Sequence, residues 1–342
     1  SGQSNTAIGA HALEDNTDGD SNTAIGYSAL EDNISGHSNT AIGAYAMEEN
    51  DEGDYNIAIG KYALQENELG DGNIAIGYQA LHLNDGGDNN IAMGDSALLN
   101  NKGDDNIALG YKALEDNTTG ADNIAMGDSA LTYNTTGVNN VAIGEDALNT
   151  NTVGDHNIAV GKESGITITT GSGNTFLGAY SDASTGTLSN STAIGYGATV
   201  TLSNTIQLGN TDIEVIRGQV AFTNASDRRL KENIIASKYG LSEVLKLEPV
   251  DYVLKSNGLK QVGFIAQDVK PLIPEVVSGI EGDLEKGETL GITYTSLIPV
   301  LTKAIQEQQT IISRLEKMLL SSLERQEVIE KELIEIRSSI KQ

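Results

Sequence analysis

The chain has 342 residues and a formal net charge of −27, with 38 Gly, 3 Phe, no Trp and no Cys. The absence of cysteine excludes disulfides and thiolate chemistry. So few aromatic residues argue against one large core, and order is expected to come from repetition instead. Residues 1–225 hold 30 acidic and 5 basic side chains, whereas residues 226–342 hold 18 and 16. The acidic segment would repel phosphates, which argues against nucleic acid and anionic membranes as partners.

One phrase, Asn-(Thr/Ile)-Ala-Ile-Gly, recurs through residues 1–210, and an x-x-Ala-Leu group and a polar turn follow most copies. Its glycine returns every 17 residues, with one step of 16 and a last step of 14. Helix breakers every few residues and the lack of a 3.6-residue period exclude a helical repeat. The glycines are Gly9, Gly26, Gly43, Gly60, Gly77, Gly94, Gly110, Gly127, Gly144, Gly161, Gly178, Gly195 and Gly209.

Neither short apolar piece of a repeat can fold alone, so the repeats are expected to stack as coils of a parallel β-solenoid. Stacked asparagine side chains can hydrogen-bond along the axis, and the glycines fit a corner with positive φ or close backbone approach. At about 4.8 Å per coil, a dozen coils would span roughly 55–60 Å. So little apolar mass per coil favours three chains around a common axis. The expected ladders are Ile8, Ile25, Ile42, Ile59, Ile76; Leu13, Leu30, Met47, Leu64, Leu81; and Asn5, Asn22, Asn39, Asn56, Asn73.

The last repeat, from Gly195 to Gly209, closely resembles the coils of trimeric autotransporter adhesin heads in spacing and residue type. That resemblance implies a trimeric left-handed parallel β-roll with 14-residue coils. The 17-residue coils contain three more residues, which we expect to lengthen the polar turn.

The polar turns and the histidines offer no clear ligand site. Turns such as 86–90 and 103–106 supply oxygen ligands but do not match the nonapeptide pattern of Ca²⁺-binding β-rolls, so we expect solvated turns and no metal or cofactor. The four histidines occupy unrelated positions and are expected at the surface without metal ligands nearby: His11, His37, His82 and His156. Residues 211–225 are expected to form strands that close the shaft and lead to the junction with the next domain.

Residues 226–296 have the composition of an ordinary mixed domain, and several motifs follow in order. They are SDRRLKENI at 226–234, VGFIAQDV at 262–269, IPEVV at 273–277 and YTSLIPVLTKAIQE at 294–307. This series resembles the endosialidase-type intramolecular chaperone domain, found at the C-termini of phage tail spikes and tail fibres. The resemblance covers about the last third of the chain. It implies a small α+β domain that trimerises, directs folding of the β-structure before it and then cuts itself off.

In that family the cut uses a serine–lysine pair, which the resemblance assigns to Ser226 and Lys231. A serine hydroxyl needs a base to accept its proton, and residues 226–342 contain no His or Cys. A lysine can serve when burial and neighbouring cations lower its pKa, and Arg228 and Arg229 are adjacent. The junction is Ala225, Ser226 and Asp227: family precedent favours cutting Ser226–Asp227, while attack on the preceding carbonyl would cut Ala225–Ser226.

Residues 297–342 carry apolar side chains with a heptad period, which predicts a coiled coil. Isoleucine at both core positions favours more than two strands, and polar layers at Gln308, Ser322 and Gln326 can fix the register. The alternative is one long amphipathic helix packed on its own domain. The predicted trimerisation positions are Ile298, Leu301, Ile305, Gln308, Ile312, Leu315 and Leu319.

These parts together predict a homotrimeric virion tail fibre or spike segment, assembled in the host cytoplasm, whose only enzymatic activity is single-turnover cleavage of itself. A host-surface glycan or protein receptor is expected from the resemblance alone. No membrane insertion is expected, because no apolar run is long enough. Two alternatives stay open: a bacterial trimeric surface adhesin, and a fragment of a glycan-degrading spike whose enzyme domain lies upstream. The start SGQSNT, without Met, suggests a piece of a longer protein.

Overall fold

The computed structural model describes residues 2–219, 225–255, 258–282 and 289–340. The chain divides into two compact units, Ser1–Glu214 and Val215–Gln342. The first unit is the repetitive segment, and the second holds the mixed domain with the terminal helix. Each unit is described separately below.

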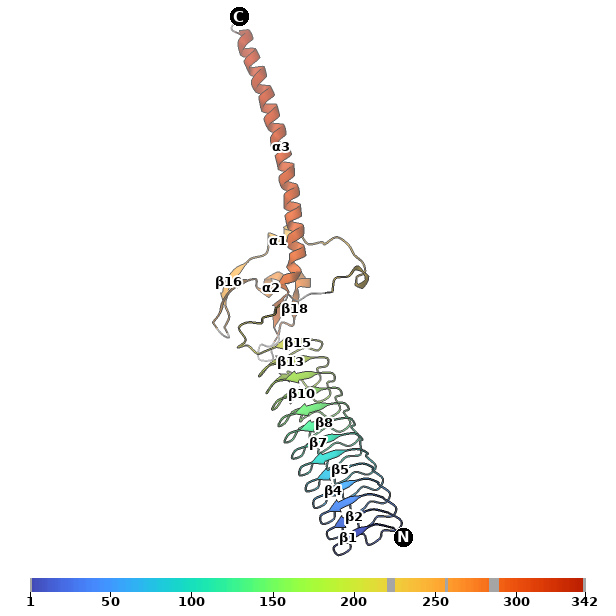
Figure 1. Cartoon of the computed structure of the whole chain (residues 1–342). Helices are drawn as coiled ribbons and strands as arrows, with labels where there is room; N and C mark the ends of the chain where they lie inside the picture. Colours follow the sequence, from blue (N-terminus) through green and yellow to red (C-terminus); the bar gives the residue numbers. More distant parts are fainter. Residues whose placement is uncertain (1, 220–224, 256–257, 283–288, 341–342) are drawn as a thin grey trace. The chain divides into compact units, whose positions relative to one another are not determined.

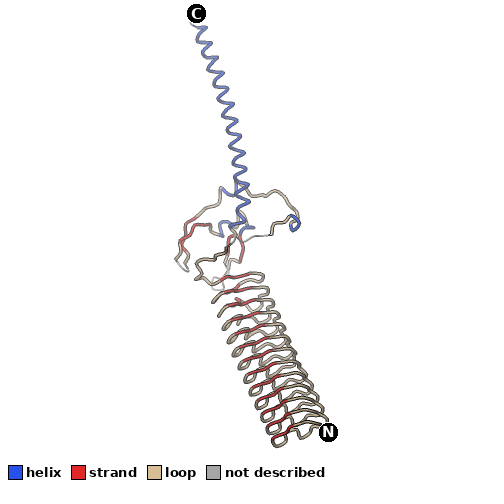
Figure 2. The backbone as a smooth tube through the Cα atoms, in the orientation of Figure 1, coloured by secondary structure: helices blue, strands red, loops and turns tan. Residues whose placement is uncertain are grey.

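The first unit is a parallel β-solenoid, as predicted from the 17-residue period. Short strands stack in one column along its length (Figures 1 and 2), forming a 13-stranded sheet. A second, two-stranded parallel sheet pairs β12 (Asp182–Ala183) with β14 (Thr199–Val200). The strands of the large sheet are β1 (Thr6–Ile8), β2 (Thr23–Ile25), β3 (Thr40–Ile42), β4 (Ile57–Ile59), β5 (Ile74–Ile76), β6 (Ile91–Met93), β7 (Ile107–Leu109), β8 (Ile124–Met126), β9 (Val141–Ile143), β10 (Ile158–Val160), β11 (Thr175–Leu177), β13 (Thr192–Ile194) and β15 (Ile206–Leu208).

Every strand pairs in register with the same phrase of the next coil, so that Ile25 lies opposite Ile42. The register survives the coil of 16 residues, where Met93 pairs with Leu109. It also survives the coil of 14 residues, where Ile194 pairs with Leu208. Shorter coils therefore lose residues outside the strands, as the sequence predicted when it assigned the extra residues to the turn.

A glycine ends each repeated strand because the next coil approaches its backbone too closely for a side chain. Gly26 has a φ of +149°, and a Cβ added there would lie 2.3 Å from the carbonyl oxygen of Gly43. Both the positive φ and the lack of space fit only glycine. The predicted role of these glycines is thus confirmed.

The core of the solenoid consists of small residues and one leucine ladder. In a strand, alternate side chains point to opposite faces, so Ala24 is buried while its neighbour Ile25 is 36% exposed. The isoleucines of the repeated phrase do stack on one another, but they form an outward ladder. The leucine ladder lies in the core: Leu30, Met47, Leu64, Leu81, Leu98, Leu114, Leu131 and Leu148 are fully buried.

The predicted asparagine ladder joins consecutive coils. The backbone N–H of Asn39 donates to Oδ1 of Asn22 at 2.8 Å, and its own Nδ2 donates to the carbonyl oxygen of Gly53 at 2.7 Å. Both residues are fully buried. Each amide therefore satisfies backbone groups that the three-residue strands leave without partners.

A second asparagine ladder, which the sequence analysis missed, runs parallel to the first. Nδ2 of Asn50 donates to Oδ1 of Asn33 and to the carbonyl oxygen of Gly53, both at 2.9 Å. The two ladders thus converge on the same glycine carbonyl in each coil. The fully buried members of the second ladder are Asn33, Asn50, Asn67, Asn84, Asn101, Asn117, Asn134 and Asn151.

The second unit contains two small antiparallel sheets and a long helix. Strand β16 (Val250–Val253) pairs with β17 (Lys260–Gly263), and β18 (Val277–Gly279) pairs with β19 (Leu290–Ile292). Its short helices are η1 (Arg228–Leu230), α1 (Leu241–Val244), α2 (Ala266–Val269), η2 (Pro274–Val276) and η4 (Tyr294–Ser296). A small core of Val269, Ile273, Val276, Leu297 and Val300 packs α2, η2 and the start of α3 together, with β18 and β19 against it. This arrangement is the predicted small α+β domain.

The terminal helix α3 spans Leu297–Ile340 as one 44-residue element, in agreement with the predicted helix. Among the described residues, no helix combines the length and apolarity that crossing a membrane requires. The closing strands predicted for residues 211–225 are absent from residues 211–219, which have no regular structure. Residues 220–224 lie outside the described part of the chain.

Candidate functional site

The candidate cleavage residues lie on a short turn at the start of the second unit. Asp227 caps η1: its Oδ1 accepts from the backbone N–H of Arg229 at 2.8 Å. The N–H of Lys231 then donates to the carbonyl oxygen of Arg228 at 3.2 Å. A capped turn of this kind brings residues five apart in sequence next to each other.

The turn places the two predicted site residues in contact. Nζ of Lys231 lies 2.7 Å from Oγ of Ser226, within hydrogen-bond distance. A neutral lysine amine at this distance can accept the serine proton, which is the geometry that an activated nucleophile requires. The pairing taken from the family resemblance is therefore spatially possible within one chain.

The electrostatic environment differs from the sequence expectation. Nη2 of Arg229 forms an ion pair with Oδ2 of Asp227 at 2.6 Å, and this contact holds the pKa of the Asp227 carboxyl below its usual range. The positive charge of Arg229 is thus compensated locally. Ser226 and Lys231 are both exposed. The single chain supplies the contact between the two residues, but not the desolvation that would activate an amine.

The predicted trimerisation seam on α3 is uncovered in the single chain. Its apolar members Ile298, Leu301, Ile305, Ile312, Leu315 and Leu319 are between 40% and 65% exposed, and Gln308 is exposed as well. A different face of the same helix, with Leu297, Val300 and Ala304, is buried. The alternative of a helix packed on its own domain therefore describes only the start of α3.

The outward ladder of the solenoid is a second uncovered apolar surface. It contains one residue per coil, directly before the repeated glycine, and these residues are mostly about two-fifths exposed. Examples are Ile25 at 36%, Ile59 at 37%, Met93 at 43%, Ile143 at 38% and Ile194 at 38%. An apolar stripe of this kind marks a surface suited to protein contact.

A ladder of tyrosines on the first coils was not predicted. The ring centroids of Tyr27 and Tyr45, and of Tyr45 and Tyr62, are 5.2 Å apart, and those of Tyr62 and Tyr78 are 6.0 Å apart. Two of these tyrosines directly follow the repeated glycine and two follow it by two positions, which hid the column in the sequence. Tyr27 and Tyr78 are nearly half exposed.

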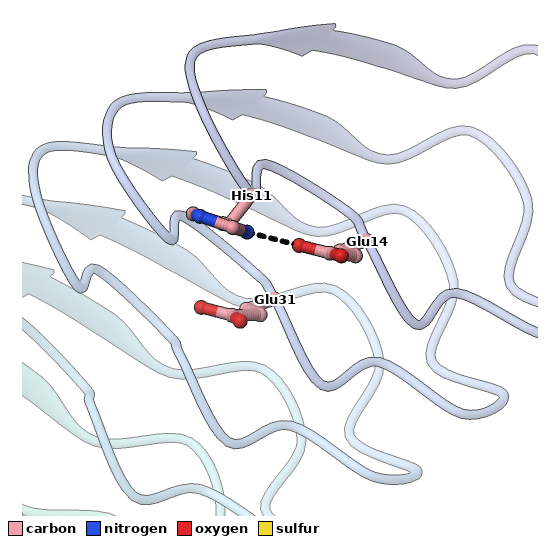
Figure 3. Close-up of side chains that lie close together, drawn as sticks. All are labelled: His11, Glu14 and Glu31. Atoms are coloured by element: carbon pink, nitrogen blue, oxygen red, sulfur yellow. Dashed lines mark hydrogen bonds and ion pairs between the residues drawn. The ribbon is translucent and has the colours of Figure 1, made fainter.

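Contrary to the expectation that no histidine lies near metal ligands, His11 adjoins two carboxylates. Its Nδ1 bonds to Glu14, and Glu31 approaches from the next coil (Figure 3). Chiefly through the hydrogen bond to Glu14, the pKa of His11 is raised above its ordinary value. His11 and Glu14 are exposed, so this is a surface ion pair rather than a built metal site. His37 and His82 are only partly exposed, so the expectation of surface histidines is confirmed for His11 and His156 alone.

The geometry thus defines a class of protein: a parallel β-solenoid shaft followed by a small domain with a serine–lysine contact and a long helix. Residues 226–278 match the family described as chaperone of endosialidase. No curated protein matches the chain. Residues 226–278 thus resemble a chaperone domain of the endosialidase type, and this match together with the upstream shaft fits a phage tail fibre.

Proposed function

We propose that three copies of this chain assemble into a tail-fibre shaft, and that the second unit aligns them and is then released by self-cleavage between residues 225 and 227. The observation that carries the cleavage step is the 2.7 Å contact between Nζ of Lys231 and Oγ of Ser226 in the matched segment. The trimer is supported by the family match and by the uncovered apolar positions of α3.

The solenoid needs such an aligning unit because its coils are nearly interchangeable. Alanine stands over alanine and isoleucine over isoleucine in successive pairs, so a slip of one coil would preserve most contacts. Non-local β-pairing is also slow and leaves edges open to aggregation. A coiled coil has only local contacts and a defined register. It can therefore bring three chains together at matched residues before the coils stack.

The proposed chemistry is acyl transfer to serine. The Ser226 hydroxyl gives its proton to the neutral amine of Lys231 while Oγ attacks the scissile carbonyl carbon. The C–N bond then breaks, the leaving nitrogen takes a proton from the lysine, and water hydrolyses the resulting ester. Attack of Oγ on the preceding carbonyl cuts Ala225–Ser226. Attack on the carbonyl of Ser226 itself would close a strained four-membered ring, so a cut at Ser226–Asp227 requires the Ser226 hydroxyl of a neighbouring chain.

Because the pair is exposed in one chain, we propose that assembly buries it. Burial disfavours the ammonium form of lysine and so activates it as a base. This order keeps the aligning unit attached until the three chains have met. After the cut, unfolded chains no longer carry the unit that aligned them, so they cannot refold into the shaft. The shaft then persists because its unfolding is slow.

Host attachment, to a surface glycan or a protein receptor, is proposed on the resemblance to tail fibres. The exposed tyrosine ladder is the shaft surface best suited to it, because tyrosine combines an apolar ring with a polar tip. The virion is accordingly the proposed location of the mature shaft.

Cleavage is tested by comparing the wild type with Ser226→Ala and Lys231→Met, using Lys246→Met as the matched control. Denaturing gels and intact mass spectrometry should show the wild type and the control split near residue 226, and both site variants whole. The fragment masses identify the bond. If the wild type itself stays at full length, the second unit is at most a permanent trimerisation module.

Assembly is tested separately on the Ser226→Ala background, which keeps the chain whole. Ile312→Asp places a charge in the predicted seam and should abolish the trimer in light scattering. Thr310→Asp adds the same charge at an outer heptad position and should leave the trimer intact. A trimer that survives Ile312→Asp would contradict the proposed seam.

A further inference from the structure

The cleavage turn is attached to the rest of the second unit through residues 237–241. Residues 225–236 are all exposed. Among the described residues, their side-chain contacts, Ser226 with Lys231 and Asp227 with Arg229, stay within this segment. The contacts of residues 237–241 therefore determine the point at which the segment with the cleavage turn leaves the folded part of the unit.

Two side chains of α3 hold that attachment point. Nζ of Lys303 donates to the carbonyl oxygen of Ser237, and Oε2 of Glu307 accepts from the backbone N–H of Leu241 at 2.7 Å. Lys303 and Glu307 also form an ion pair with each other at 3.5 Å. We call Lys303 and Glu307 the helix clamp.

The local backbone is shaped for this contact. Leu241 begins α1, whose first N–H groups need partners from outside the helix, and Gly240 before it has no side chain to supply one. A Cβ on Gly240 would lie only 2.4 Å from Oε2 of Glu307. Glycine at this position thus allows a carboxylate 66 residues away in sequence to cap the short helix.

A further contact fixes the same segment from another side. Nζ of Lys238 pairs with Oε1 of Glu275 at 3.1 Å, and the hydroxyl of Tyr239 also donates to that carboxylate. Tyr239 packs against the small core of the unit. Residues 237–241 are therefore a fixed base, while the cleavage turn beyond them is fixed only by its own contacts.

The helix clamp lies beside the predicted trimer seam in the same turns of α3. With Ile298 at heptad position a, Lys303 occupies position f and Glu307 position c, both outside the seam. The same turns of α3 therefore carry two sets of side chains. Leu301 and Ile305 belong to the predicted seam, and the helix clamp binds the segment that leads to the cleavage turn.

We infer that Lys303 and Glu307 are positioning residues that couple assembly of α3 to placement of the Ser226–Lys231 pair. The inference rests on the proposed self-cleavage. When the helices associate, the clamp sets residues 237–241 at a fixed place relative to the trimer axis, so that the turn is presented to the neighbouring chains. Without the clamp, the trimer forms but the turn is misplaced.

The experiment follows cleavage of newly made full-length chain after cell-free synthesis is stopped, with denaturing and native gels run on the same samples. The rate is expressed per assembled trimer. Lys303→Met and Glu307→Leu should leave the trimer fraction unchanged and slow cleavage about 10- to 100-fold, the usual cost of displacing a reacting group by about 1 Å. Lys317→Met and Glu324→Leu, at outer positions further along α3, should cleave at the wild-type rate.

Conservative variants separate positioning from general stability. Lys303→Arg keeps a donor, and Glu307→Gln keeps an oxygen that can accept from Leu241, so both should restore most of the rate. The inference is overturned if Glu307→Leu cleaves at the wild-type rate per trimer, or if its rate falls only as its trimer fraction falls. A wild type that never cleaves instead defeats the proposed function.

Discussion

Asn67→Ala tests whether the second asparagine ladder holds the solenoid together. Asn67 is fully buried in a central coil. Its Nδ2 donates to Oδ1 of Asn50 at 3.0 Å and to the carbonyl oxygen of Gly70 at 2.8 Å. Its Oδ1 accepts from Nδ2 of Asn84 at 2.8 Å. Alanine removes all three bonds and leaves a space with no route for bulk water.

The three partners are not affected equally. Gly70 keeps the bond from Asn56 at 2.7 Å, and Asn84 keeps its bond to Gly87 at 2.6 Å. Oδ1 of Asn50, however, loses its donor. One buried acceptor without a partner costs about 1–3 kcal/mol, and the other lost bonds add about 1 kcal/mol net. We therefore expect a loss of about 2–4 kcal/mol per chain.

The assay is the unfolding rate of the shaft in guanidinium, followed by circular dichroism, because a proposed kinetic stability is measured as a rate. If the lost bonds are absent from the transition state, unfolding should accelerate by about 30- to 1000-fold. Glu68→Ala, an exposed turn neighbour, should change the rate by no more than about twofold. An Asn67→Ala shaft that unfolds as slowly as this control would refute the role of the stacked amides.

Two further predictions concern the corner glycines and pH. Gly77→Ala should prevent stacking, since its Cβ would lie 2.4 Å from the next coil's carbonyl oxygen. Gly86→Ala strains a backbone with a φ of +90° but meets no atom within 4 Å, so it should cost some stability and still assemble; native gels compare the two. Asp32 and Glu49 are exposed, but partial desolvation by the neighbouring coils, together with nearby carboxylates, raises the pKa of both. The folded shaft thus binds protons more tightly than the unfolded chain, and unfolding should be slower near pH 4 than near pH 7. In the second unit, the pKa of Glu275 is lowered, chiefly by the hydrogen bond from Tyr239. This carboxylate therefore stabilises that unit more near pH 7 than near pH 4.

The sequence predicted the solenoid well because its period, strand positions and corner glycines are repeated features. The prediction that the isoleucines stack on one another is confirmed. The sequence could not predict which face of a three-residue strand points inward. Ala24 and Ile25 are both apolar, and only the curvature of the coil decides that the smaller one is enclosed. The same limitation hid the second asparagine ladder, since an asparagine such as Asn33 in a polar turn resembles a solvated residue.

The candidate site shows a different limit. Family resemblance pointed to Ser226 and Lys231, and the turn that joins them has its own signature in the capping residue Asp227. The helix clamp had none, because Glu307 and Leu241 meet across 66 residues of sequence. Long-range contacts between one side chain and a backbone group leave no periodic pattern, so only the fold reveals them.

Two of the exceptions to the repeat lie in its last coils. At the mid-strand position that is alanine in the neighbouring coils, β11 carries Phe176, which is fully buried. Room for it comes from Gly165, where the preceding coils have leucine: a Cβ there would lie 2.7 Å from the Phe176 ring and 3.0 Å from Leu148.

Within one chain, a leucine in place of this glycine would meet the Phe176 ring, and overpacking of a core typically costs about 1–3 kcal/mol. The one 14-residue coil, ending at Gly209, follows in sequence. The uniform coils are thus interchangeable in their packing, whereas the coils of Gly165 and Phe176 carry side chains that would not fit elsewhere in the stack.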